Sequence, residues 1–145
     1  YDDTRASDYL GAWLAHLLLC ADPAPGVRCE TRGLSRDGEF RFAALEPATA
    51  WEALATLLGL YRRGLCAPLH FFPKSAWVYV KNSDNARKAM EKWSGGMHTE
   101  YGEGNDPAYR LALRGVDEPL DETFFTLAGK LFAPLGRHLV DERLV

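Results

Sequence analysis

The chain is organised around the segment Gly64-Leu65-Cys66-Ala67-Pro68-Leu69-His70-Phe71-Phe72-Pro73-Lys74-Ser75-Ala76-Trp77. Helical patterns flank this segment, but Pro68 and Pro73 lack a backbone N–H and push the residue before each of them out of the helical region. We therefore expect the segment to run extended. Its apolar side chains would insert between neighbouring helices, where each contributes about 1.5–3 kcal/mol when fully buried. We interpret the following residues as a structural wedge: Pro68, Leu69, Phe71, Phe72 and Pro73.

Length and composition predict one domain that needs no disulfide or metal to fold. A chain of 145 residues buries roughly 68–70% of the surface that its unfolded form exposes. The cysteines, Cys20, Cys29 and Cys66, form an odd set without a C-x-x-C pair, which indicates reduced thiols in a cytoplasmic protein. No run of about 18 apolar residues predicts a membrane span. Because the sequence begins without methionine, we expect residues 1–145 to be a single domain cut from a longer subunit.

The net charge of −3 conceals two stretches of opposite sign. Residues 61–92 contain seven basic and two acidic side chains, whereas residues 93–123 contain seven acidic and two basic ones. Such a division is typical of a phosphate-facing side and a protein-facing side, although two solvated helical faces would give the same pattern.

Periodic apolar residues predict an α+β, mostly helical fold in which helices pack around one β-hairpin. The hairpin is expected from Val27–Leu34 and Glu39–Leu45, with an Asp-Gly turn at residues 36–38. Helices are expected in six places: Leu10 to Leu18, capped by Ser7; Trp51 to Leu65, capped by Thr49; Pro73 to Val80; Ala86 to Trp93, capped by Ser83 or Asp84; Pro107 to Leu113, capped by Asp106; and Leu120 to Leu139, bent or restarted at Pro134.

One histidine and one group of acids are expected to have no catalytic role. His16 lies off the predicted apolar face of the first helix, which is typical of a structural or solvated histidine. Glu100, Glu103 and Asp106 could ligate a divalent cation, but they lack the spacing of a calcium loop, and Asp106 is already expected to cap a helix. We therefore expect a solvated acidic loop here.

The hairpin also contains the acids nearest to a nuclease motif. A nuclease of the restriction-endonuclease type needs an Asp on one strand and an acid-x-Lys on the next, because two carboxylates hold Mg²⁺ and the lysine orients the attacking water. The nearest strings, Glu30-Thr31-Arg32 and Glu39-Phe40-Arg41, have arginine in place of lysine, and its fixed planar fork does not reproduce an ammonium. Alternating hairpin polarity explains these residues equally well. A metal-dependent nuclease using Glu30 and Glu39 is the alternative that this pattern leaves open.

Basic residues with aromatic residues between them follow the central segment. Charge and stacking of this kind support contacts to a nucleic-acid backbone or to single strands. The candidates for contact with the DNA backbone or with a partner are Lys74, Trp77, Lys81, Arg87, Lys88 and Lys92. At helical spacing Trp77 is also typical of a core residue. A stand-alone nucleic-acid-binding module that uses Lys74, Arg87, Lys88 and Lys92 is therefore a further alternative.

Four stretches together resemble one known family. They are Gly59–Leu65 with Pro68–Trp77, the helix Leu10–Leu17 with its tryptophan-leucine-x-histidine-leucine pattern, the acid-rich loop and helix Tyr101–Gly115, and the closing helix Leu120–Leu135. In this order they resemble the C-terminal end of the exodeoxyribonuclease V gamma subunits, the RecC family of the bacterial RecBCD helicase-nucleases. The sequence departs from the family at His70, where proline is frequent, and at Glu100, where a basic residue is common.

The resemblance implies a scaffold domain without catalytic residues, cofactor or metal. It implies a nuclease-like fold of the restriction-endonuclease type that has lost its active site, in a cytoplasmic complex that acts in DNA repair and recombination. The implied partners are the beta subunit and the alpha (RecD) subunit, and DNA through the full complex, without a membrane.

Overall fold

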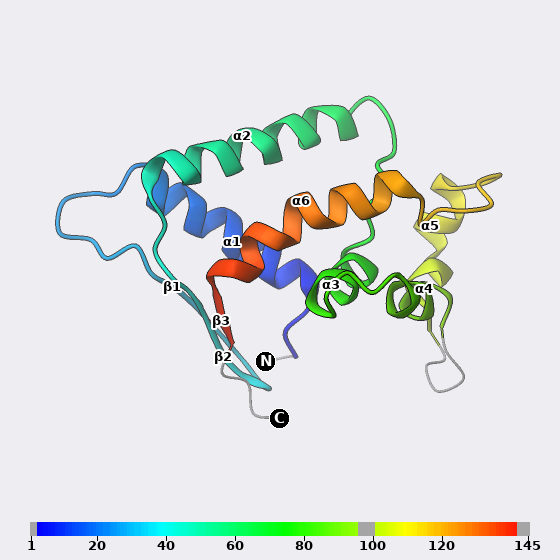
Figure 1. The fold of residues 1–145 in the computed structure, drawn as a ribbon, viewed down its shortest axis with the longest axis horizontal. Coiled ribbons are helices and arrows are strands. Elements are labelled where there is room, and N and C mark those ends of the chain that lie inside the picture. Colours follow the sequence, from blue (N-terminus) through cyan, green and yellow to red (C-terminus); the bar gives the residue numbers. More distant parts are fainter. Residues whose placement is uncertain (1–2, 96–100, 142–145) are drawn as a thin grey trace. The chain divides into compact units, whose positions relative to one another are not determined.

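The computed structural model describes residues 3–95 and 101–141 of the chain. The fold is α+β and mostly helical, with one three-stranded antiparallel sheet (Figure 1). The chain divides into two compact units. Unit 1 runs up to Arg63 and resumes at Pro134, and unit 2 comprises Gly64–Ala133.

Unit 1 contains two long helices and the sheet. Its elements are α1 (Ala6–Ala21), β1 (Thr31–Ser35), β2 (Gly38–Phe42), α2 (Pro47–Gly64, whose last residue belongs to unit 2) and β3 (Leu139–Asp141). The predicted hairpin is confirmed, with Thr31 opposite Phe42 and Ser35 opposite Gly38. Gly38 has a φ of 127°, a backbone conformation that residues other than glycine rarely adopt. This conformation explains why glycine follows Asp37 in the turn. The third strand was not expected, because the last helix was predicted to run into Leu139.

The helix α1 covers the sheet with a face that differs from the predicted one. Trp13 and Leu17 are buried as expected, but Leu14 and Leu18 are exposed. Tyr9, His16 and Cys20 take their places, and the rings of Tyr9 and Trp13 pack on Phe40 and Phe42 at centroid distances of 4.8 and 5.1 Å. The prediction that His16 lies off the buried face is therefore wrong.

His16 links α1 to the open end of the hairpin, at the start of β1 and just after the end of β2. Its Nδ1 lies 3.0 Å from the hydroxyl of Thr31, and its Nε2 lies 3.1 Å from the carbonyl oxygen of Ala43. A carbonyl oxygen can only accept, so Nε2 carries the proton and Nδ1 accepts from the Thr31 hydroxyl. Burial lowers the pKa of His16 below its ordinary 6.5, and the Ala43 carbonyl only partly opposes this effect.

Unit 2 contains the helices that follow the central segment. They are α3 (Pro73–Lys81), α4 (Ala86–Ser94), the 3₁₀ helix η1 (Glu103–Asn105), α5 (Pro107–Ala112) and α6 (Glu122–His138), whose last turn belongs to unit 1. The helix start at Pro73 is confirmed, and so is the cap at Asp106, whose carboxylate accepts from the backbone N–H of Ala108 at 2.8 Å. The predicted cap of α4 is wrong. Asn85 caps this helix, because Ser83 and Asp84 both adopt a left-handed φ of 57°.

The depressed pKa of His16 makes the stability of the chain sensitive to acid. Because the folded pKa lies below 6.5, the unfolded chain binds more protons near that pH. The contribution of neutral His16 is thus complete above pH 6.5 and is lost as the pH falls below it. In His16→Gln, urea unfolding followed by circular dichroism should show a flatter dependence of the unfolding free energy on pH. His138→Gln retains the His16 ring and should remain steeper; equal slopes in the two variants would contradict the assignment.

Candidate interaction surface

The central segment brings aromatic rings together within unit 2. Phe72 is buried, and its ring centroid lies 4.2 Å from that of Trp93, 5.2 Å from that of Tyr109 and 5.7 Å from that of Phe124. Phe71 is half-buried and stacks on Phe132 at 5.9 Å. The predicted wedge residues Pro68 and Leu69 are less enclosed: Pro68 is exposed and Leu69 is half-buried. The aromatic pair therefore makes the packing contacts, and the prolines shape the backbone around it.

A side-chain hydrogen bond fastens the same segment to the start of α6. The Nδ1 of His70 lies 2.8 Å from Oδ2 of Asp121, and the other carboxylate oxygen accepts from the backbone N–H of Phe124 at 2.8 Å. One carboxylate thus caps α6 and also holds the residue before Phe71. His70 was noted as a departure from the family pattern, and the structure gives it a partner.

The start of α3 is capped from a distant part of the chain. Phe72 occupies the cap position and has no side-chain acceptor, so the backbone N–H groups of the first turn need another partner. Glu103 of η1 provides it: its two carboxylate oxygens accept from the N–H groups of Lys74 at 3.0 Å and Ser75 at 2.7 Å. Negative charge at a helix N-terminus is also favoured by the helix dipole.

Glu103 is 6% exposed, so the expectation of a solvated acidic loop is wrong at this residue. Of the other two acids, Asp106 caps α5, and Glu100 lies outside the described residues. The role of Glu103 left no signal in local sequence except the glycines on either side of it. A Cβ on Gly102 would lie 2.3 Å from the carbonyl oxygen of Trp93, and one on Gly104 would lie 2.6 Å from the Trp93 ring. Gly-Glu-Gly therefore allows η1 to lie close against α4.

Removing the carboxylate of Glu103 should weaken α3. Glu103→Ala leaves two N–H groups unpaired, that of Ser75 in a buried position, and an unsatisfied buried donor costs about 1–3 kcal/mol. The loss is expected as a lower midpoint of urea unfolding. Glu118→Gln removes an exposed carboxylate from the same unit and should leave the midpoint unchanged. A Glu103→Ala midpoint equal to that of wild type would contradict the capping role.

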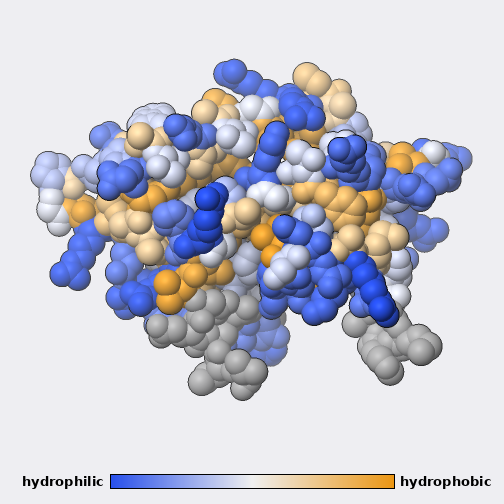
Figure 2. Space-filling view, in the orientation of Figure 1, coloured by the Kyte–Doolittle hydropathy of each residue, from blue (hydrophilic) through white to orange (hydrophobic). Residues whose placement is uncertain are grey.

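The predicted contact residues lie on two neighbouring helices. Lys74, Trp77 and Lys81 are on α3, and Arg87, Lys88 and Lys92 are on α4. Figure 2 shows hydrophilic side chains gathered where these helices lie in Figure 1.

These residues do not all present a free charge. Arg87 pairs with Glu91 at 3.0 Å, and the Nζ of Lys88 donates to Asn82 at 2.6 Å. Trp77 is half-buried and packs on Phe132 at a centroid distance of 5.3 Å. The exposed lysines of α3, Lys74 and Lys81, are therefore the members of this set best suited to contact an anionic partner.

The helix α2 presents an exposed apolar face made of residues whose helical spacing predicted this helix. Trp51 is 60% exposed, Leu58 50% and Tyr61 64%, and their spacing places them on one side of the helix. Only Ala50 and Leu60 of this helix are buried. We call Trp51, Leu58 and Tyr61 the α2 stripe. Arg62 and Arg63, at the end of the helix, are exposed beside it.

The acids of the nuclease alternative are engaged by arginine. Glu30 accepts a hydrogen bond from Arg32, and Arg32 also lies 3.6 Å from Glu39. The bond with Arg32 lowers the pKa of Glu30. Among residues 3–95 and 101–141 no group of three or more His, Cys, Asp or Glu side chains could hold a metal ion.

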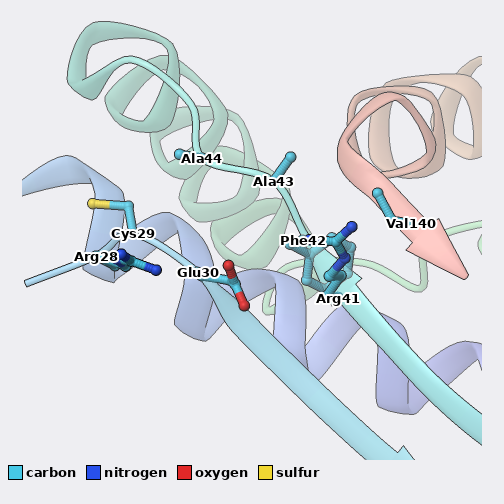
Figure 3. A pocket seen from close by; sticks show the side chains of 8 residues that line it. All are labelled: Arg28, Cys29, Glu30, Arg41, Phe42, Ala43, Ala44 and Val140. Atoms are coloured by element: carbon cyan, nitrogen blue, oxygen red, sulfur yellow. The ribbon is translucent and has the colours of Figure 1, made fainter.

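An open hollow of about 370 Å³ lies beside these residues in unit 1. Figure 3 shows Arg28 and Glu30 on one side of the hollow, with Arg41 and Val140 on the other.

Within the described part of the chain, no helix has both the length and the apolar character needed to cross a membrane.

Comparison with known proteins gives two matches. The family model described as "RecC C-terminal domain" matches residues 1–84. The curated protein "RecBCD enzyme subunit RecC" of Escherichia coli (strain K12) is 30% identical to this chain over 142 residues. That alignment covers 86% of this chain and 12% of the relative, so the chain spans about an eighth of the relative's length.

Proposed function

The chain belongs to the RecC C-terminal domain family, and from this membership we propose that it is a non-catalytic assembly domain of a bacterial helicase-nuclease. In this proposal the domain docks the beta and alpha subunits of exodeoxyribonuclease V, which acts in double-strand-break repair and homologous recombination. The name of the matched relative, a subunit of the RecBCD enzyme, supports membership of a complex. The proposal includes a nuclease-like fold that has lost its active site. The pairing of Glu30 and Glu39 with Arg32 supports this part.

The α2 stripe is the observation that carries the docking proposal. Tryptophan and tyrosine are enriched at the centres of protein interfaces, where each large apolar side chain contributes about 1.5–3 kcal/mol on burial. Trp51 and Tyr61 lie on the same face of α2 and are more than half exposed. Arg62 and Arg63 would lie at the rim of such an interface, which suits a partner surface with an apolar centre and acidic edge.

The test places charge within the α2 stripe of the full-length subunit. Leu58→Lys should reduce capture of the partner subunits by at least about tenfold, because a loss of 1.4 kcal/mol changes affinity tenfold. Thr56→Lys is the matched control, since it adds the same charge to an exposed position on another side of α2. Pull-down at equal protein concentration, with circular dichroism to verify folding, gives the measurement. Wild-type capture by Leu58→Lys would contradict docking through α2.

We also propose that the exposed lysines of α3 and α4 contact the DNA backbone. Log affinity falls with log salt, and each lost phosphate contact makes this fall less steep by about 0.7 for a single strand. Lys74→Ala and Lys81→Ala should therefore weaken single-strand binding most at low salt, whereas Lys130→Ala, exposed on α6, should not. Fluorescence anisotropy at several salt concentrations measures this. Absence of binding at low salt would exclude the contact, and Mg²⁺-dependent cleavage abolished by Glu30→Ala would instead support the nuclease alternative.

A further inference from the structure

Two of the three cysteines meet in unit 1. Cys20 lies in the last turn of α1 and is fully buried, and Cys29 lies on the segment before β1 and is partly exposed. The Sγ of Cys29 is 3.9 Å from the carbonyl oxygen of Leu19, the chain neighbour of Cys20, so the two cysteines lie next to each other at the end of α1. This pair could not be predicted from the sequence, because Cys20 and Cys29 do not form a recognisable cysteine motif.

The connection between the two cysteines is an exposed loop. It contains Pro23 and Pro25, which restrict the backbone, and Gly26, whose φ of 79° reverses it. The N–H of Val27 donates to the carbonyl oxygen of Ala24 at 3.1 Å. The chain between the cysteines is thus short, and these local restraints limit its conformations.

The two thiols differ in their access to solvent. Cys29 borders the open hollow shown in Figure 3 and is partly exposed, with its sulfur turned away from Glu30 and Arg41. Cys20 is enclosed, and its Sγ lies 3.5 Å from Nε2 of His16. Burial raises the pKa of Cys20, which keeps it in the thiol form at rest. An accessible thiol beside a buried one is the arrangement in which the first is oxidised and the second resolves it.

We propose that Cys20 and Cys29 form a disulfide when a peroxide reaches the partly exposed thiol of Cys29. The sulfur of Cys29 attacks one peroxide oxygen, the O–O bond breaks, and the products are a sulfenic acid on Cys29 and one water. The sulfur of Cys20 then attacks the sulfenic sulfur, the S–O bond breaks, and the departing hydroxide takes the Cys20 proton to form a second water. The two thiols together lose two electrons and two protons, which the peroxide gains as it forms two waters. The bond links the last turn of α1 to the segment that enters β1.

The test uses the full-length chain with Cys66→Ser, so that the exposed third thiol cannot form mixed species. After treatment with hydrogen peroxide, denaturing alkylation and proteolysis, mass spectrometry should detect a peptide pair joined through residues 20 and 29 that is lost on reduction. The oxidised chain should also have a higher melting temperature than the reduced chain, because the crosslink restricts the unfolded state.

Single variants distinguish the order of events. In Cys20→Ala the sulfenic acid on Cys29 should accumulate and be trapped by dimedone, whereas in Cys29→Ser the thiol of Cys20 should remain alkylatable only after denaturation. The proposal is overturned if both thiols of the Cys66→Ser chain remain fully alkylatable at a peroxide concentration that oxidises Cys66 in wild type. It is equally overturned if peroxide links residue 20 or 29 only to another chain.

Discussion

Unit 2 depends on how the chain leaves α2 and starts α3. Pro68 and Pro73 prevent one continuous helix, and Pro73 supplies the fixed φ of a first helical residue but leaves the next two N–H groups without a local acceptor. The carboxylate of Glu103 supplies that acceptor from 28 residues further along the chain. These two hydrogen bonds require η1 to lie at the start of α3, and the glycines on both sides of Glu103 allow η1 to lie close against α4 as well. The aromatic packing of Phe72 is formed within the same set of contacts.

Much of the fold followed from local patterns, and the errors at His16, Glu103 and β3 share one physical cause. The positions of the helices, the Asp-Gly turn and the Asp106-Pro107 start are signals within a few residues, and the structure agrees with them, whereas the caps predicted at Ser7, Thr49 and Ser83 or Asp84 are wrong. His16 and Glu103 are polar residues whose burial depends on acceptors or donors far away in sequence. Local hydrophobicity cannot identify such partners, because a buried polar group is tolerated only once its distant hydrogen bonds are formed. The short strand β3 was missed for the same reason, since it depends on pairing with β2.

The candidate surfaces were predicted in part. The sequence identified the basic residues of α3 and α4, but it could not show that Trp77 packs on Phe132 or that Arg87 pairs with Glu91. For the acids of the hairpin, the structure agrees with the sequence analysis. The sequence has arginine where a nuclease has lysine, and in the structure Arg32 is hydrogen-bonded to Glu30 and lies close to Glu39. A guanidinium in that position occupies the carboxylate oxygens that a divalent cation would need.

The contrast between α1 and α2 bears most directly on function. Both helices are rich in apolar residues, but α1 buries seven of its residues and α2 buries two. Helices gain most of their stability from packing an apolar face, and propensity alone leaves a helix of this length marginal in water. An 18-residue helix with so few buried residues therefore lacks the main source of stability that α1 possesses. In an assembly domain, a partner subunit would supply that packing, so the α2 stripe is better explained as an interface than as a fully solvated surface.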